Sequence, residues 1–161
     1  MDINIDVLRT SMNVKNSLSR IKTLTGIPNW NIICRWAFCL SIKQTSLPRE
    51  VEEKLDGVEI DYDTLFNKNK SIYTQLLINN LITHKVEIDK KNLTKYLYAH
   101  VNRGVNIIYT NKSSWTYILV TSNYKHINYI IDFNIRLIVV KLNKFNISKI
   151  ISNREYYCAI R

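Results

Sequence analysis

The stretch GIPNWNIICRWAFCLSI, residues 26–42, decides the fold, because it carries a single charge, Arg35, in a largely apolar and aromatic run. Pro28 is tolerated in the first turn of a helix, where its missing N–H costs little. The apolar residues that follow recur at helical spacing and form one broad stripe, which Phe38 and Ile42 widen. We therefore expect a central helix that contacts other helices or another subunit.

Arg35 has three possible explanations in such a run: a membrane span, a buried helix with a paired arginine, or a helix that brings arginine to an anion. A span is excluded, because Pro28, Asn29 and Asn31 interrupt the run and it falls short of roughly 18 continuous apolar residues. A buried unpaired charge is prohibitive. Arg35 should therefore pair with Asp or Glu of another helix or chain, or reach a phosphate group. We favour the structural pairing, and the phosphate contact stays open.

The residues before this run predict a strand and a helix. Residues 3–10 alternate apolar and polar side chains, a period-two pattern typical of a short strand. Residues 13–24 place apolar side chains at helical spacing, with Asn13 as the expected N-cap and Gly26 as the expected end. The opposite face of this helix is basic and carries Lys15, Lys22 and, at its margin, Arg20.

The residues after the run divide into three parts. Residues 49–63 are strongly acidic and contain an Asp-Gly turn signal, so we predict an exposed connection there. Apolar periodicity predicts helices over 71–82 and from about residue 91 to 108, and Asp89 is placed to cap the second. From residue 111 to 161 there is no Gly and no Pro, and the composition is strand-like.

These patterns predict a mainly α fold: a short N-terminal strand followed by a helix bundle. Strand, helix, helix is the order of the ribbon-helix-helix dimer, in which two N-terminal strands pair across a two-fold axis. The change in composition near residue 110 predicts a helical domain over residues 1–110. Residues 111–161 form a C-terminal extension, whose structure the sequence leaves open between β and unfolded.

Charge points to an anionic partner. The 161 residues contain 23 Lys and Arg against 13 Asp and Glu, a net charge of +10. Nucleic acid is the commonest reason for such a surplus, and an anionic membrane surface comes next. Residues 49–66 hold two basic and seven acidic side chains, net −5, so the positive charge is concentrated on either side of this acidic connection.

Catalytic and metal-binding patterns are absent from the sequence. It contains no P-loop, no G-x-S-x-G and no His-rich metal spacing, so we expect no enzyme activity, no metal and no cofactor. Three scattered cysteines and an acidic N-terminus without an apolar h-region suit a cytoplasmic protein. We expect His100 to make structural hydrogen bonds. Arg103 contacts either a phosphate group or the end of a neighbouring helix.

Two stretches resemble the DndE family of DNA phosphorothioation proteins. They are LSRIKTLTGIPNWNIICRWAFCLSI at 18–42 and YAHVNRGV at 98–105, and the similarity covers roughly residues 5–109. The resemblance implies a mostly helical, self-associating protein that binds DNA, with a preference for nicked duplex. It also implies a non-catalytic role beside DndC and DndD, which supply sulfur transfer and ATPase activity.

We therefore predict a DNA-binding accessory subunit that holds nicked duplex DNA through clustered cations. The predicted DNA contacts are Lys15, Arg20, Lys22, Lys43, Arg35 and Arg103. Secondary candidates are Lys68, Lys70, Lys90, Lys91 and Lys95. Two alternatives stay open. One is a ribbon-helix-helix repressor that reads an operator through Asn4, Asp6 and Leu8, and the other is a scaffold that binds only partner proteins.

Overall fold

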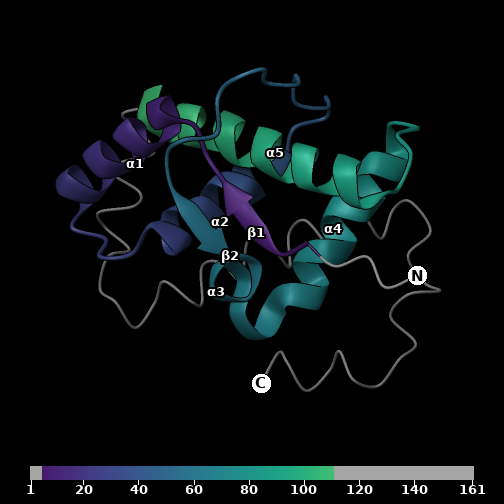
Figure 1. Ribbon diagram of the computed structural model, residues 1–161, viewed down its shortest axis with the longest axis horizontal. Helices are drawn as coiled ribbons and strands as arrows, with labels where there is room; N and C mark the ends of the chain where they lie inside the picture. The colour runs from purple at the N-terminus through teal and green to yellow at the C-terminus, as the bar shows by residue number, and fades with distance from the viewer. Residues whose placement is uncertain (1–4, 111–161) are drawn as a thin grey trace. The chain divides into compact units, whose positions relative to one another are not determined.

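The computed structural model describes residues 5–110, and the expectations for residues 111–161 lie outside this range. It confirms a mainly helical fold with a short strand near the N-terminus (Figure 1). The elements in chain order are β1 (Val7–Arg9), α1 (Met12–Thr25), α2 (Trp30–Ile42), β2 (Glu59–Asp61), α3 (Tyr62–Phe66), the 3-10 turn η1 (Asn67–Asn69), α4 (Lys70–Thr83) and α5 (Lys90–Thr110). None of the helices within residues 5–110 has the length and apolar character needed to cross a membrane.

Local sequence signals set the ends of α1. Its N-cap is Ser11, whose hydroxyl oxygen accepts from the backbone N–H of Val14 at 3.4 Å, so the prediction of Asn13 as the cap is wrong. Gly26 ends the helix as predicted. Its φ of 70° is left-handed, and its N–H donates to the carbonyl of Lys22 at 2.9 Å.

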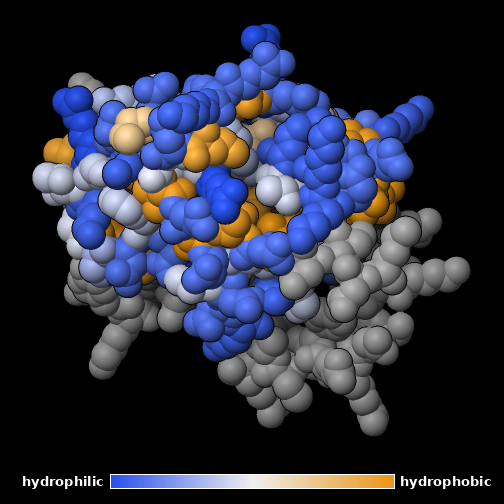
Figure 2. Space-filling view, viewed as in Figure 1, coloured by the Kyte–Doolittle hydropathy of each residue, from blue (hydrophilic) through white to orange (hydrophobic). Residues whose placement is uncertain are grey.

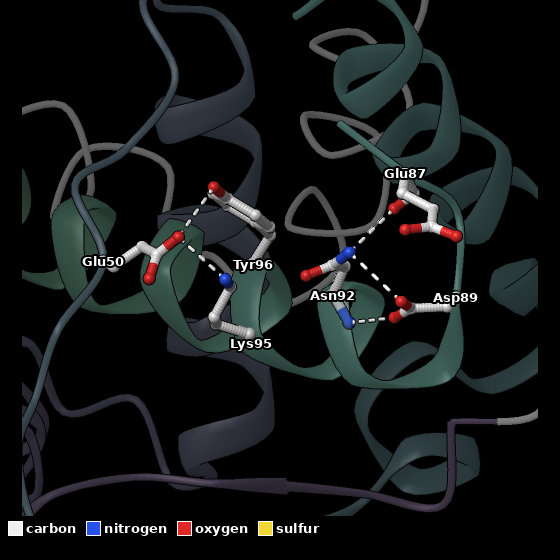
Figure 3. A network of polar contacts seen from close by, with 6 residues as sticks. All are labelled: Glu50, Glu87, Asp89, Asn92, Lys95 and Tyr96. Atoms are coloured by element: carbon white, nitrogen blue, oxygen red, sulfur yellow. Dashed lines mark hydrogen bonds and ion pairs between the residues drawn. The ribbon is translucent and has the colours of Figure 1, made fainter. Parts of the chain in front are cut away.

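The cap predicted for α5 is confirmed. Oδ1 of Asp89 accepts from the backbone N–H of Asn92 at 2.6 Å. The side-chain amide of Asn92 in turn donates to the Glu87 carbonyl and to Oδ2 of Asp89, as Figure 3 shows. The bond to the Asn92 N–H satisfies one of the backbone donors that the first turn of a helix leaves unpaired, and the other two hold the capping loop in place.

Strand β1 pairs with β2 of the same chain. The pairing is antiparallel, with Leu8 opposite Ile60. The prediction of an exposed connection through residue 63 is therefore wrong at its end, where β2 and α3 begin. Val58, Ile60 and Tyr62 alternate with exposed acidic residues and are buried, because they face the helices below the hairpin. Residues 49–58 contain neither helix nor strand.

Helices α2 and α5 form the centre of the core, as the apolar run at 26–42 predicted (Figure 1). They approach so closely at Ala37 and Gly104 that a Cβ on Gly104 would overlap the backbone of Ala37. Phe38 on α2 is fully buried and makes edge contacts with the rings of Phe66 and Tyr73, with centroids at 5.5 and 5.9 Å. Core stability therefore depends on this helix crossing.

Gly104→Ala is expected to destabilise the protein by roughly 3 kcal/mol, because the new methyl group must push α5 away from α2. At an open helix position the same change would stabilise by about 1 kcal/mol, so the sign of the effect tests the contact. Urea denaturation followed by circular dichroism measures it. Gly26→Ala is the control: its left-handed φ should cost about 1 kcal/mol, with nothing within 4 Å of the new methyl group.

Candidate nucleic-acid interface

The candidate interface comes from a part of the chain that has no carboxylate side chains. Residues 10–49 contain no Asp or Glu and include all of α1 and α2. They hold six basic residues, of which five are predicted DNA contacts: Lys15, Arg20, Lys22, Arg35 and Lys43. The surface that these helices present therefore carries cations with no acidic side chains of its own.

Helix α1 carries three predicted contacts, which project from two different sides of the helix. Lys15 and Lys22 are seven residues apart, which is two helical turns, so they project from the same side. Arg20 projects from the other margin, where Nη1 donates to the hydroxyl of Tyr109 at 3.1 Å. Among residues 5–110, no carboxylate forms an ion pair with any of these three cations.

Lys43 lies apart from this face. It is exposed and follows the last residue of α2, whereas Lys22 lies beside the start of that helix, with Nζ 5.8 Å from the centroid of the Trp30 ring. The 13 residues of α2 span about 20 Å. The predicted contacts therefore do not form one cluster.

Arg35 contacts the protein's own backbone. It is half-buried, and Nη1 donates to the carbonyl of Leu65 in α3 at 2.9 Å. The expected carboxylate partner is not found among residues 5–110. Burial lowers the pKa of this guanidinium, an effect that neighbouring Tyr73 and the cysteines partly oppose. Arg35 therefore links α2 to α3, and a phosphate contact by it stays a prediction.

Arg103 binds the end of α2. Of the two predicted roles, a phosphate contact and a contact to the end of a neighbouring helix, the structure therefore has the second. Its Nη2 donates to the Ser41 carbonyl at 2.7 Å, and its Nη1 donates to the Ser46 carbonyl at 2.8 Å. These are main-chain acceptors in and just beyond the last turn of α2, which have no partner within the helix. A cation there also opposes the negative end of the helix dipole.

Arg103 starts a chain of side-chain hydrogen bonds that is buried at its centre and half-buried at its two ends. Its Nε donates to Oγ of Ser41 at 2.7 Å, so the Ser41 hydroxyl is free to donate to Nδ1 of His100 at 2.9 Å. Nε2 of His100 must then carry the proton and donate to Oδ1 of Asn80 at 3.1 Å. All four side chains are satisfied with a neutral imidazole, which fits the structural role expected for His100.

Several secondary candidates are neutralised by carboxylates. Lys70 pairs with Asp63 at 2.6 Å, Lys90 with Asp6 at 2.7 Å and Lys95 with Glu50 at 2.7 Å. Glu50 comes from the acidic connection and also accepts from the hydroxyl of Tyr96, as Figure 3 shows. The Lys95 ammonium and, next, Tyr96 lower the pKa of Glu50. These cations are therefore less available to DNA than those of α1.

Trp30, the aromatic residue beside Lys22, was not singled out from the sequence. Tyr96 and Tyr98 are buried among core residues. Trp30 is half-buried and lies next to Lys22. No sequence signal separates it from core aromatics, because its exposure depends on how α1 and β2 flank the start of α2.

The two cysteines that the structure describes are unsuited to sulfur chemistry. Cys34 and Cys39 lie in the core on α2, and burial raises the pKa of each thiol to about 12. A thiol with such a pKa is protonated and weakly reactive at neutral pH. Within residues 5–110, no group of three or more His, Cys, Asp or Glu side chains is placed to hold a metal ion.

Most of the surface seen in Figure 2 is hydrophilic, with apolar residues in smaller patches. Four large apolar side chains of the described residues are exposed: Met12, Leu24, Leu55 and Ile82. Two of them, Met12 and Leu24, lie on α1. The candidate interface is therefore polar and cationic, with single apolar residues at the two ends of its helix.

The chain is similar to proteins of DNA sulphur modification. The model of the family described as DNA sulphur modification protein DndE matches residues 7–115, about two thirds of the chain. The fold is similar to the crystal structure of DndE from Escherichia coli B7A, described as involved in DNA phosphorothioation modification. That similarity has a TM-score of 0.56 and 24% identity, and covers 64% of this chain and 95% of that one. No curated protein matches the sequence.

The buried His100 predicts a specific pH dependence of stability. Burial, followed by the charge of Arg103, lowers the pKa of His100 from 6.5 to about 3. Below pH 6.5 this histidine is therefore protonated in the unfolded chain and stays neutral in the folded one. This contribution to stability is therefore present above pH 6.5 and lost as pH falls towards 3. Between pH 7 and pH 5 the loss should be about 2 kcal/mol.

Urea midpoints of the wild type and His100→Gln, each measured at pH 7 and pH 5, test this. Glutamine can still bond Ser41 and Asn80 but takes up no proton, so its stability should fall less. Equal pH dependence of stability in the two proteins would show that folding does not lower the pKa of His100.

Proposed function

We propose, because the chain belongs to the DndE family, that it takes part in DNA phosphorothioation as a DNA-binding accessory subunit. The observation that carries this proposal is the basic face of α1. Lys15 and Lys22 share one side of this helix and have no carboxylate partner among residues 5–110, whereas Lys70, Lys90 and Lys95 do. Unpaired cations on a rigid helix are free to neutralise phosphates and release counterions from the duplex.

The proposed role is to hold duplex DNA, nicked duplex in particular, for partner enzymes. The described thiols are buried and protonated, and the buried imidazole of His100 is committed to Ser41 and Asn80. The chain then supplies DNA binding, and its proposed partners DndC and DndD supply sulfur transfer and ATPase activity. A homo-oligomer in the cytoplasm completes the proposal.

The described contacts favour this role over a ribbon-helix-helix repressor. In that dimer, strand side chains read the groove of the operator. Here Leu8 is 1% exposed, and Asp6 pairs with Lys90 at 2.7 Å. One edge of β1 is already bonded to β2 of the same chain. The scaffold alternative predicts no DNA binding by the isolated protein, so a binding measurement separates it from both.

The double variant Lys15→Gln/Lys22→Gln should bind duplex DNA roughly 10- to 100-fold more weakly than the wild type at about 0.1 M salt. The slope of log affinity against log salt should shrink by about 2, because two phosphate contacts are lost. Fluorescence anisotropy titrations over a series of salt concentrations measure both quantities, on intact and nicked duplexes of the same sequence. The loss should be equal for unrelated sequences.

Lys90→Gln/Lys95→Gln is the matched control, because it changes net charge by the same amount at two cations that are already paired. It should retain nearly the wild-type affinity and salt slope. Equal losses in both variants would mean that only net charge matters, and the α1 face would not be the interface. Absence of binding by the wild type would favour the scaffold.

A further inference from the structure

A groove lies beside the basic face, between the start of α2 and strand β2. It has a volume of about 530 Å³ and is shallow and open to solvent on one side. Lys22 forms part of its rim, so the groove is continuous with the cations of α1. Pro28 and Trp30 line one wall, and Ile60 lies on the other. DNA bound on α1 would therefore pass the mouth of this groove.

The α2 wall combines an aromatic surface with amides. Trp30 is half-buried, flanked by Asn29 and Asn31, and Asn29 makes no side-chain cap bond to its own helix. Nε1 of Trp30 and Oδ1 of Asn31 have no hydrogen-bond partner among residues 5–110 and are shielded from water. The same burial closes both atoms to a bound group, so this wall offers chiefly the half-buried ring of Trp30 and the exposed side chain of Asn29.

The opposite wall offers main-chain groups. Thr10 N–H donates to the Val58 carbonyl and Tyr62 N–H to the Asp6 carbonyl, so residues 58 and 62 face β1. Because alternate residues of an antiparallel strand bond to opposite sides, the N–H and C=O groups of Glu59 and Asp61 face away from β1. Both residues line the groove. Asp61 is the N-cap of α3, and its carbonyl accepts the first bond of that helix, so the edge of β2 offers the N–H and C=O of Glu59 and the N–H of Asp61.

The charges of the groove exclude a phosphate but not a neutral group. Carboxylates of Glu59 and Asp61 oppose Lys22 across it, and Glu59 already pairs with Arg9 at 2.9 Å. An anion inside would meet the carboxylate of Asp61, which has no cationic partner within residues 5–110. A phosphate therefore belongs outside, with the α1 cations, while a planar uncharged group with hydrogen-bonding edges fits within. A nucleobase has these properties, and aromatic side chains stack on bases.

We infer that this groove receives one unstacked nucleobase of the DNA held on α1, with the base against Trp30 and its phosphate beside Lys22. The inference rests on the proposed function, since α1 must first bind the duplex. It assigns Trp30 a role that phosphate contacts cannot fill. The protein then favours DNA in which a base is free to leave the stack, at an unpaired position or a strand end.

Two duplexes test this with the full-length chain, one fully paired and one with a single unpaired thymine. The wild type should bind the second more tightly by about 5- to 150-fold, the usual value of one stacked base. Trp30→Ala should remove that preference and leave the affinity for paired duplex and its salt slope unchanged. Trp30→Phe keeps a stacking ring and should keep most of the preference.

Photocrosslinking locates the base directly. With 5-iodouracil at the unpaired position, the crosslink should map to the tryptic peptide 23–35, which contains Trp30 and no other aromatic residue. Trp36 lies in the separate peptide 36–43, which serves as the internal control. A crosslink outside 23–35, or an undiminished preference in Trp30→Ala, would overturn the inference.

The two proposals fail separately. If the wild type binds paired duplex with a steep salt dependence but gains nothing from the unpaired thymine, the base site is wrong and the DNA-binding role stands. If the wild type binds neither duplex, the proposed function falls and the base site falls with it. If the groove instead takes an extended peptide against the edge of β2, the wild type should bind the two duplexes equally tightly. That result would overturn the base site.

Discussion

The close contact of α2 with α5 is the constraint on which the other parts of the fold depend. Gly104 lets the two backbones meet at Ala37, so the helices are held at a separation that no larger residue permits. That separation places Ser41 within reach of both Arg103 and His100. It also sets where α2 begins, and so where Trp30 lies relative to Lys22 and β2.

A line of polar side chains crosses this otherwise apolar core. It runs from Arg103 through Ser41 and His100 to Asn80, and so joins α5, α2 and α4. Each member has a hydrogen-bond partner, which makes burial of the polar atoms tolerable. Apolar contacts between helices permit sliding by small steps, whereas this line is satisfied in one register only. The network therefore specifies how the three helices align.

Sequence periodicity was sufficient for the helices but not for the hairpin or the polar contacts. The apolar run at 26–42 predicted a central helix, because burial on nearly every side leaves a plain compositional signal. Strand β2 has only three residues, in an acidic stretch, and its partner lies about 50 residues away, so no local period reveals it. Arg35 and Arg103 bind main-chain carbonyls, which every residue has, so no spacing could identify their partners. Ser11 and Asn13 are both good N-caps, and backbone geometry alone selects Ser11.

The long sequence separation of these contacts governs when the protein can fold during its synthesis. Arg103 follows Ser41 by 62 residues, and Tyr109 follows Arg20 by 89. At a translation rate of about 5–20 residues per second, α2 is made roughly 3 to 12 s before the residues of α5 that cover it. During that interval α2, the most apolar of the described helices, lacks the helix that makes most of its contacts, and only the completion of α5 ends the exposure of that face to chaperones and to other nascent chains.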